Sequence, residues 1–91
     1  MADLLSDEEI EERKPDGWER DGEEIVKRFE FDEYLRGVAF AQVVGEIAEA
    51  QVHHPEIVIR YGEVEVRLTT HDAGGITEKD IEMAELLETE A

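Results

Sequence analysis

The sequence has 91 residues and carries 26 Asp and Glu against nine Lys and Arg, so its formal net charge is −17. It contains no cysteine, which excludes disulfides, thiolate metal sites and cysteine nucleophiles. Nucleic acid and anionic lipid require clustered cations, so neither is expected as a direct partner. No apolar run approaches the roughly 20 residues of a membrane span, and the acidic N-terminus lacks the basic region of a signal peptide. We therefore expect a single cytoplasmic domain over residues 1–91.

The acidic surplus comes mainly from many glutamates and few lysines, since nineteen residues are glutamate and only three are lysine. Apolar residues still recur with helix and strand periods, which favours a folded domain with an acidic surface over a disordered acidic chain. Such a surface is typical of proteins from salt-rich cytoplasm, where screening over about 3 Å at 1 M salt limits self-repulsion. An ordinary acidic mesophilic protein is the alternative.

The N-terminal segment predicts a short helix. Ser6 and Glu9 have the spacing of a capping box, which satisfies two free backbone donors at a helix start. The helix should end before Pro15, because the residue preceding a proline disfavours helical backbone.

Residues 18–31 predict a hairpin. Asp21-Gly22 is the signal for a two-residue turn, and the residues after it alternate between two faces. Lys27 interrupts the apolar face of the second strand, which favours an edge strand or a curled strand.

A long helix is predicted from Asp32, as its cap, to about Val52, and Pro55 ends it. Its apolar stripe is wide, so the helix should be buried on more than one side. Gly45 in its middle costs roughly 1 kcal/mol relative to alanine. A close contact with another element or subunit would explain that glycine.

Residues 56–70 alternate around Gly62 and predict a second hairpin. Thr77 and Asp80 then have the spacing of a capped third helix. The order α-β-β-α-β-β-α indicates an α+β fold, with a four-stranded antiparallel sheet covered on one face by helices. Because the other face is left partly bare, we expect the chain to dimerise through a strand edge or a helix face.

The three histidines all lie at junctions between predicted elements. His53 and His54 precede the third strand, and His71 follows the fourth. The two ends of an antiparallel hairpin meet at one edge of the sheet, so the three imidazoles should surround one pocket.

Carboxylates lie close to these histidines in the sequence. Glu49 is four residues before His53 and shares its helix face if the helix continues, so it could orient that imidazole. Asp72 and Asp80 offer carboxylates near His71, although helix capping alone would explain Asp80. Ordinary surface histidines remain one alternative, and a metal site is another. Adjacent histidines point their rings apart, however, which disfavours shared ligation.

A longer spaced signature resembles a known family. Its residues run Glu49-x3-His53-His54-Pro55-x5-Tyr61-x9-His71-x8-Asp80, and the segment 70–77 resembles the family's second histidine loop. This pattern is similar to that of the pterin-4a-carbinolamine dehydratases, and the resemblance extends from about residue 6 to residue 87. It implies an antiparallel four-stranded sheet with helices on one face.

The resemblance also implies an activity. Family members remove water from 4a-hydroxytetrahydropterin to give quinonoid dihydropterin, which recycles the pterin of aromatic amino acid hydroxylases. They use no metal and no other cofactor, since the pterin is the substrate. They form homodimers or homotetramers, the latter through the long helix. Some animal members bind a homeodomain transcription factor, a role that nothing in this sequence supports. A non-catalytic pterin- or protein-binding module of the same fold is the alternative.

By the same resemblance, His53, His54 and His71 occupy the catalytic positions. His53 and His71 would carry the acid–base transfers, and His54 would bind the pterin edge and be able to act as an acid. The resemblance and the spacing together point to five residues that bind or orient the substrate: Glu49, Pro55, Thr70, Asp72 and Asp80.

Two positions depart from the family pattern. Many members carry Asp or Asn directly before the first histidine, where this chain has Val52. Many carry Arg before the final Asp, where this chain has Lys79, which lacks the planar fork for bidentate contacts. Substrate affinity or orientation is therefore expected to differ.

Overall fold

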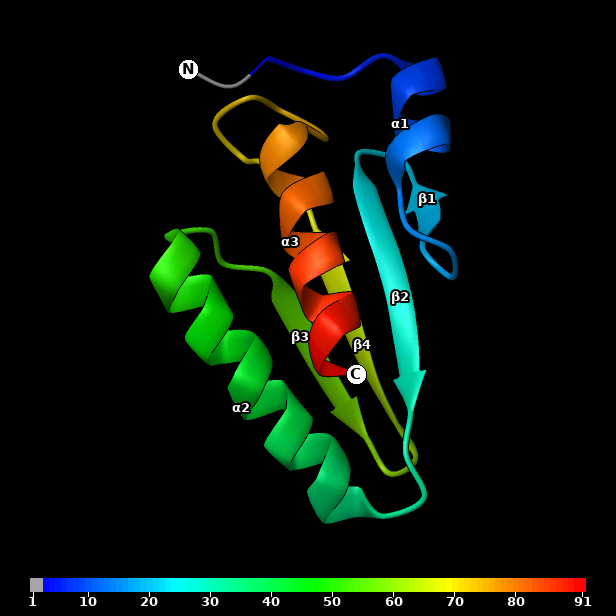
Figure 1. Ribbon diagram of the computed structural model, residues 1–91, viewed down its shortest axis with the longest axis vertical. Helices are drawn as coiled ribbons and strands as arrows, with labels where there is room; N and C mark the ends of the chain where they lie inside the picture. The colour runs from blue at the N-terminus through cyan, green and yellow to red at the C-terminus, as the bar shows by residue number, and fades with distance from the viewer. Residues whose placement is uncertain (1–2) are drawn as a thin grey trace.

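The computed structural model describes residues 3–91 and has its elements in the predicted order (Figure 1). Both predicted capping boxes are present, at Ser6 and at Thr77. The elements are α1 (Asp7–Arg13), β1 (Glu19–Asp21), β2 (Glu24–Glu30), α2 (Tyr34–Gln51), β3 (Glu56–Arg60), β4 (Glu63–Leu68) and α3 (Glu78–Glu90).

The strands form one antiparallel sheet in the order β1-β2-β4-β3, so pairing of β2 with β4 joins the two hairpins. The helices lie over one face of this sheet (Figure 1), which confirms the predicted α+β architecture. The core between them draws on β2, β4 and all three helices. Its fully buried side chains include Ile10, Ile25, Val44, Val64, Val66, Leu68, Ile81 and Leu87.

Lys27 lies on the helix-covered face of β2, which is an internal strand, so the expectation of an edge strand is wrong. Its Nζ is 2.7 Å from Glu88 Oε2 and 4.9 Å from the centre of the Phe29 ring. The same Glu88 oxygen accepts a hydrogen bond from Trp18 Nε1 at 3.1 Å. A carboxylate near the end of α3 thus compensates the cation, which allows an ammonium group to lie beside the core.

The first hairpin turns one residue later than predicted. Asp21 pairs with Glu24, so the two turn residues are Gly22 and Glu23. Gly22 has φ 64°, and a positive φ at the first turn position only is typical of a type II′ turn. The sequence signal was correct for a tight turn but not for its register.

Helix α2 also differs locally from the prediction. Its N-cap is Glu33 instead of Asp32, and no side chain caps its start. A Cβ added at Gly45 would meet nothing within 4 Å, so the close contact expected there is absent among residues 3–91. Gly45 borders an open groove instead.

The sheet face opposite the helices is covered by charged side chains. Glu65 lies at its centre and is only 3% exposed. It accepts hydrogen bonds from Arg67 Nε at 2.5 Å, Arg60 Nη1 at 2.9 Å and Arg28 Nε at 3.1 Å. The hydrogen bonds from Arg67 and Arg60 lower the pKa of Glu65 to about 2. The face expected to be partly bare therefore carries an ion network.

This network should make stability depend on pH. Because the native pKa of Glu65 lies below its ordinary value of 4.5, its contribution is complete above about pH 4.5 and is lost as the pH falls towards 2. Glu65→Gln should remove that part of the acid dependence, and should lose on the order of 3 kcal/mol or less at pH 7. Urea unfolding at a series of pH values measures both, and equal acid slopes for the two proteins would contradict the expectation.

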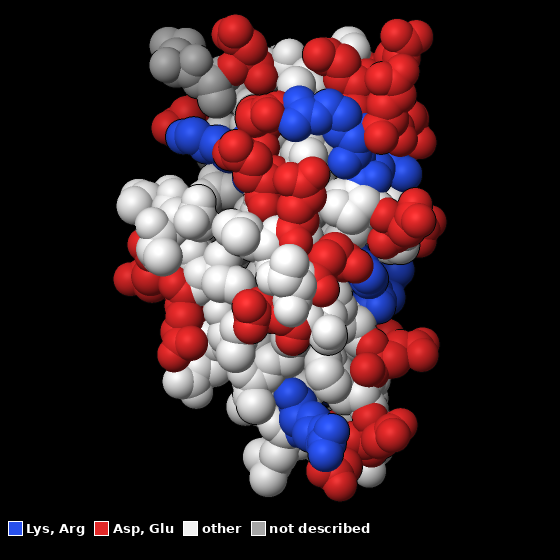
Figure 2. All heavy atoms as spheres, in the orientation of Figure 1, with Lys and Arg blue, Asp and Glu red and all other residues white. Residues whose placement is uncertain are grey.

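Acidic side chains are spread over the helix-covered side of the molecule, and basic ones lie next to acidic ones (Figure 2). Within residues 3–91, Lys79 is the one Lys or Arg whose side chain has no carboxylate oxygen within 4.0 Å. No helix in the described part of the chain is long and apolar enough to cross a membrane.

Candidate functional site

The three histidines meet at one end of the sheet, where α2 and β4 end and α3 begins (Figure 1). They line a single cavity of about 200 Å³, as the hairpin register predicts. The cavity is lined by Val52, His53, His54, Thr69, Thr70, His71, Asp72 and Lys79.

The end of α2 determines where the first histidine points. Val52 adopts left-handed backbone with φ 51° and ψ 46°. The N–H of His53 donates to the carbonyl of Ala48 at 3.0 Å, the bond that closes a helix through a left-handed residue. This turn takes His53 off the helix, so the predicted pairing of Glu49 with His53 is wrong.

His53 instead faces α3. Its Nε2 lies 2.6 Å from Asp80 Oδ1, and the Asp80 side chain is fully buried. The other Asp80 oxygen accepts the backbone N–H of Thr77 and the hydroxyl of Thr70, each at 2.8 Å. Asp80 therefore caps α3 and is the carboxylate partner of His53. The sequence had indicated it as a carboxylate near His71 instead.

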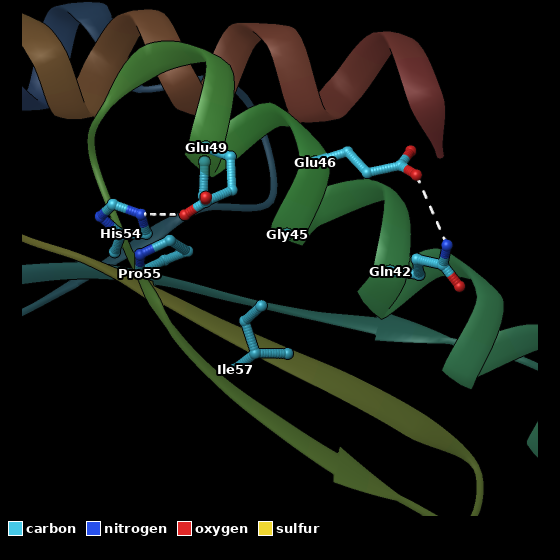
Figure 3. A pocket seen from close by; sticks show the side chains of 8 residues that line it. Gln42, Gly45, Glu46, Glu49, His54, Pro55 and Ile57 are labelled. Atoms are coloured by element: carbon cyan, nitrogen blue, oxygen red, sulfur yellow. Dashed lines mark hydrogen bonds and ion pairs between the residues drawn. The ribbon is translucent and has the colours of Figure 1, made fainter.

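His54 points the other way, towards α2. Its Nε2 lies 2.5 Å from Glu49 Oε2 (Figure 3). The two side chains are 60% and 77% exposed, so the pair is solvated and contributes little to stability. The His54 ring is consequently free to exchange this contact for one with a ligand.

A second hollow, of about 440 Å³, lies between α2 and β3 (Figure 3). Glu49, His54 and Pro55 border it, and Gly45 and Ala48 belong to its helix wall. Of these residues, His54 alone also lines the three-histidine cavity. Glu49 and Pro55 thus lie beside that cavity and not in it.

The loop after β4 carries the third histidine. Thr70 fixes the loop, because its N–H donates to the Gly75 carbonyl at 2.9 Å and its own carbonyl accepts from Gly74 at 2.9 Å. These bonds close the loop that contains His71 and Asp72, and both residues line the cavity. The His71 ring makes no hydrogen bond within residues 3–91, so both of its nitrogens are available to a ligand.

The sequence pattern marks Val52 and Lys79 only as departures from the family and does not indicate Thr69 or Thr77 as site residues. Lys79 lines the cavity without an ion-pair partner in the described chain, so its ammonium is available to a ligand. Thr77 was predicted as a helix cap, which it is, but its hydroxyl also lies 2.8 Å from that of Thr70. No local pattern signals that second contact, since it joins two loop ends.

The arrangement suits proton transfer. An ionised carboxylate only accepts hydrogen bonds, so Asp80 requires the proton of neutral His53 to lie on Nε2. Its Nδ1 then carries the lone pair, and it has no partner among residues 3–91. No buried side-chain nitrogen or oxygen in that range is unpaired, so Nδ1 must reach the solvent. His53 thus offers a proton acceptor whose tautomer the fold sets.

The left-handed Val52 should be a point of strain. A branched side chain at this φ is a conformational outlier, whereas asparagine tolerates it. Val52→Asn should therefore stabilise the chain by about 1 kcal/mol, and thermal unfolding measures the gain. Val52→Ala removes the branch without gaining that tolerance, and should stabilise less. A Val52→Asn variant no more stable than the original chain would contradict this reading.

Fold and cavity together define a small α+β protein with a cavity lined by histidines, one of which is held by a buried carboxylate. The sequence from residue 3 to residue 89 matches the family model described as pterin 4 alpha carbinolamine dehydratase. The chain belongs to the pterin-4a-carbinolamine dehydratase family.

Individual relatives agree with this assignment. A protein of Natronomonas pharaonis, provisionally named pterin-4-alpha-carbinolamine dehydratase, is 60% identical over 93% of this chain and 92% of its own length. A protein of Haloarcula marismortui with the same provisional name is 61% identical over 96% and 95%. Both organisms are halophilic archaea. The crystal structure of a transcriptional coactivator/pterin dehydratase from Brucella melitensis superposes with a TM-score of 0.86 at 35% identity, covering 93% of this chain and 95% of that one.

Proposed function

We propose that this protein is a hydro-lyase that converts 4a-hydroxytetrahydropterin to quinonoid dihydropterin in pterin recycling. Family membership and the names of its relatives support a pterin carbinolamine as the substrate. The observation that carries the proposal is the meeting of three imidazoles at one cavity, with one ring bonded to a buried carboxylate.

The reaction needs two proton transfers. One proton must reach the 4a oxygen so that the carbon–oxygen bond breaks and water leaves. Another must leave N5, whose electron pair then forms the double bond to C4a. Imidazole suits both transfers, because its ordinary pKa lies near neutral pH. The proposed reaction uses no metal and no cofactor, since the pterin is the substrate.

The geometry suggests how the roles divide. His53 has a lone pair on Nδ1 and is assigned as the base that receives the N5 proton. His71 is assigned as the acid that protonates the leaving hydroxyl, because neither of its nitrogens is engaged within residues 3–91. His54 is assigned to the pterin edge and Asp72 to orienting the pterin, while Thr70 and Asp80 are assigned to orienting groups on the His53 side of the cavity. Glu49 and Pro55 act indirectly, by placing His54.

The acidic surface is proposed to be an adaptation to a salt-rich cytoplasm. The net charge of −17 and the halophilic relatives support this. Assays should therefore be run at several molar salt as well as at low salt, because screening over about 3 Å at 1 M reduces repulsion within the chain. Light scattering on the same samples measures the molar mass and so tests the proposed dimer or tetramer.

The test of the proposal is dehydration of the carbinolamine followed by stopped-flow absorbance with and without the purified chain. The expected result is a rate proportional to protein concentration, well above the spontaneous rate. A non-catalytic pterin-binding module would instead bind the substrate and leave the rate at the spontaneous value, which would end the enzyme assignment.

A further inference from the structure

A chain of hydroxyl groups lies behind the carboxylate that holds His53. Thr70 Oγ1 is 2.8 Å from Asp80 Oδ2 and 2.8 Å from Thr77 Oγ1. Thr77 and Asp80 are completely buried, and Thr70 is 7% exposed. Although Thr70 borders the cavity, its hydroxyl is therefore engaged inside the protein and not with solvent.

The chemistry of these groups sets the direction of donation along this series of hydrogen bonds. An ionised carboxylate cannot donate, so the single hydroxyl proton of Thr70 must point to Asp80. The bond between the two threonines then needs the proton of Thr77. Thr77 is able to supply it, because its own oxygen accepts the backbone N–H of Lys79 at 3.2 Å. The order of donation runs from Lys79 to Thr77, to Thr70, and to Asp80.

The backbone makes Thr70 a rigid link. Its N–H and its carbonyl are both bonded across the loop, to Gly75 and Gly74, each at 2.9 Å. The Asp80 oxygen that Thr70 contacts also accepts the Thr77 N–H at 2.8 Å. With two donors fixed on Oδ2, Oδ1 is left to face His53.

We propose that Thr70 is a positioning residue for His53: directed by Thr77, its hydroxyl holds Asp80 so that Nε2 of His53 carries the proton and Nδ1 faces the substrate. The catalytic part of this inference rests on the function proposed above. The tautomer part does not, since it concerns the resting protein.

Helix capping alone does not account for the contact. Helix α1 begins with the same kind of box, in which Ser6 bonds Glu9. Both residues are exposed there, and the Ser6 hydroxyl has no second side-chain partner in the described chain. The bond from Thr77 to Thr70 is additional to what capping requires.

The test compares Thr70→Val, which keeps the branched shape but loses the hydroxyl, with Thr70→Ser, which keeps the hydroxyl. Ring ¹⁵N shifts in NMR spectra report the tautomer of His53, and steady-state assays report kcat and KM. Thr70→Val should increase the Nδ1–H form and lower kcat about tenfold with little change in KM. Thr70→Ser should restore both, which simple loss of packing would not predict.

Ser6→Ala is the matched control, because it removes a cap of the same kind and should lower stability without moving either readout. If Thr70→Val does not fold, Thr77→Val interrupts the series of hydrogen bonds one hydroxyl earlier. It should shift both readouts in the same direction. A folded hydroxyl-less variant with an unchanged His53 tautomer overturns the inference. If the unaltered chain holds the Nε2–H tautomer but does not speed dehydration, the proposed function fails while the tautomer inference stands.

Discussion

Replacing His53 with alanine should slow carbinolamine dehydration by about 10²- to 10⁴-fold, the range that a positioned acid–base group contributes. The effect should appear in kcat, because this ring is assigned to proton transfer. Folding should survive, because His53 lies outside the hydrophobic core cluster and its partner Asp80 keeps two other donors. Single-turnover kinetics with the carbinolamine measures the loss.

His54→Ala provides the comparison within the same pair. His54 is 60% exposed and pairs with an exposed Glu49, so it is assigned to binding the pterin edge. Its loss should raise KM more than it lowers kcat. Equal effects of the two substitutions on kcat would contradict the division of roles that the structure suggests.

The Asp80→Asn variant should lose at least about 10²-fold in kcat, for a reason that can be traced atom by atom. The N–H of Thr77 can only donate, so the amide must place its oxygen where Oδ2 now lies. Its NH₂ group then faces Nε2 of His53, which must become an acceptor. The ring proton therefore moves to Nδ1 and removes the lone pair assigned to the substrate.

Glu82→Gln is the control for Asp80→Asn. It makes the same change of charge on the same helix, at an exposed position outside the cavity. The pH–rate profile and the His53 ¹⁵N shifts should change for Asp80→Asn and stay unchanged for Glu82→Gln. An Asp80→Asn protein that keeps its Nε2–H tautomer and its kcat would refute this account of His53.

Much of the fold could be predicted because its signals are local. Ser6 and Thr77 cap helices through residues three positions away, and the strands alternate with a period of two residues. The order of the strands is not local, since pairing of β2 with β4 joins segments about 40 residues apart in the chain. Lys27 shows the same limit: its compensating carboxylate is Glu88, at the other end of the sequence.

The sequence predicted that the three histidines would line one cavity, but it did not predict the partners of two of them. The hairpin register was enough to bring His71 to the cavity of His53, and the end of the long helix near Val52 was predicted, but the left-handed backbone at that end was not. Valine disfavours left-handed backbone, so no rule of local sequence predicts that conformation at Val52. The left-handed turn directs His53 to Asp80. Glu49 therefore pairs with His54 and not, as expected, with His53.

The central claim is that the junction histidines catalyse the dehydration, and one measurement tests it most directly. The His53→Ala/His71→Ala double variant removes the proposed base and acid together while leaving Asp80 and its threonines in place. The account predicts that this folded protein still binds the pterin but dehydrates the carbinolamine no faster than buffer. A double variant that retains the rate of the unaltered chain would contradict it.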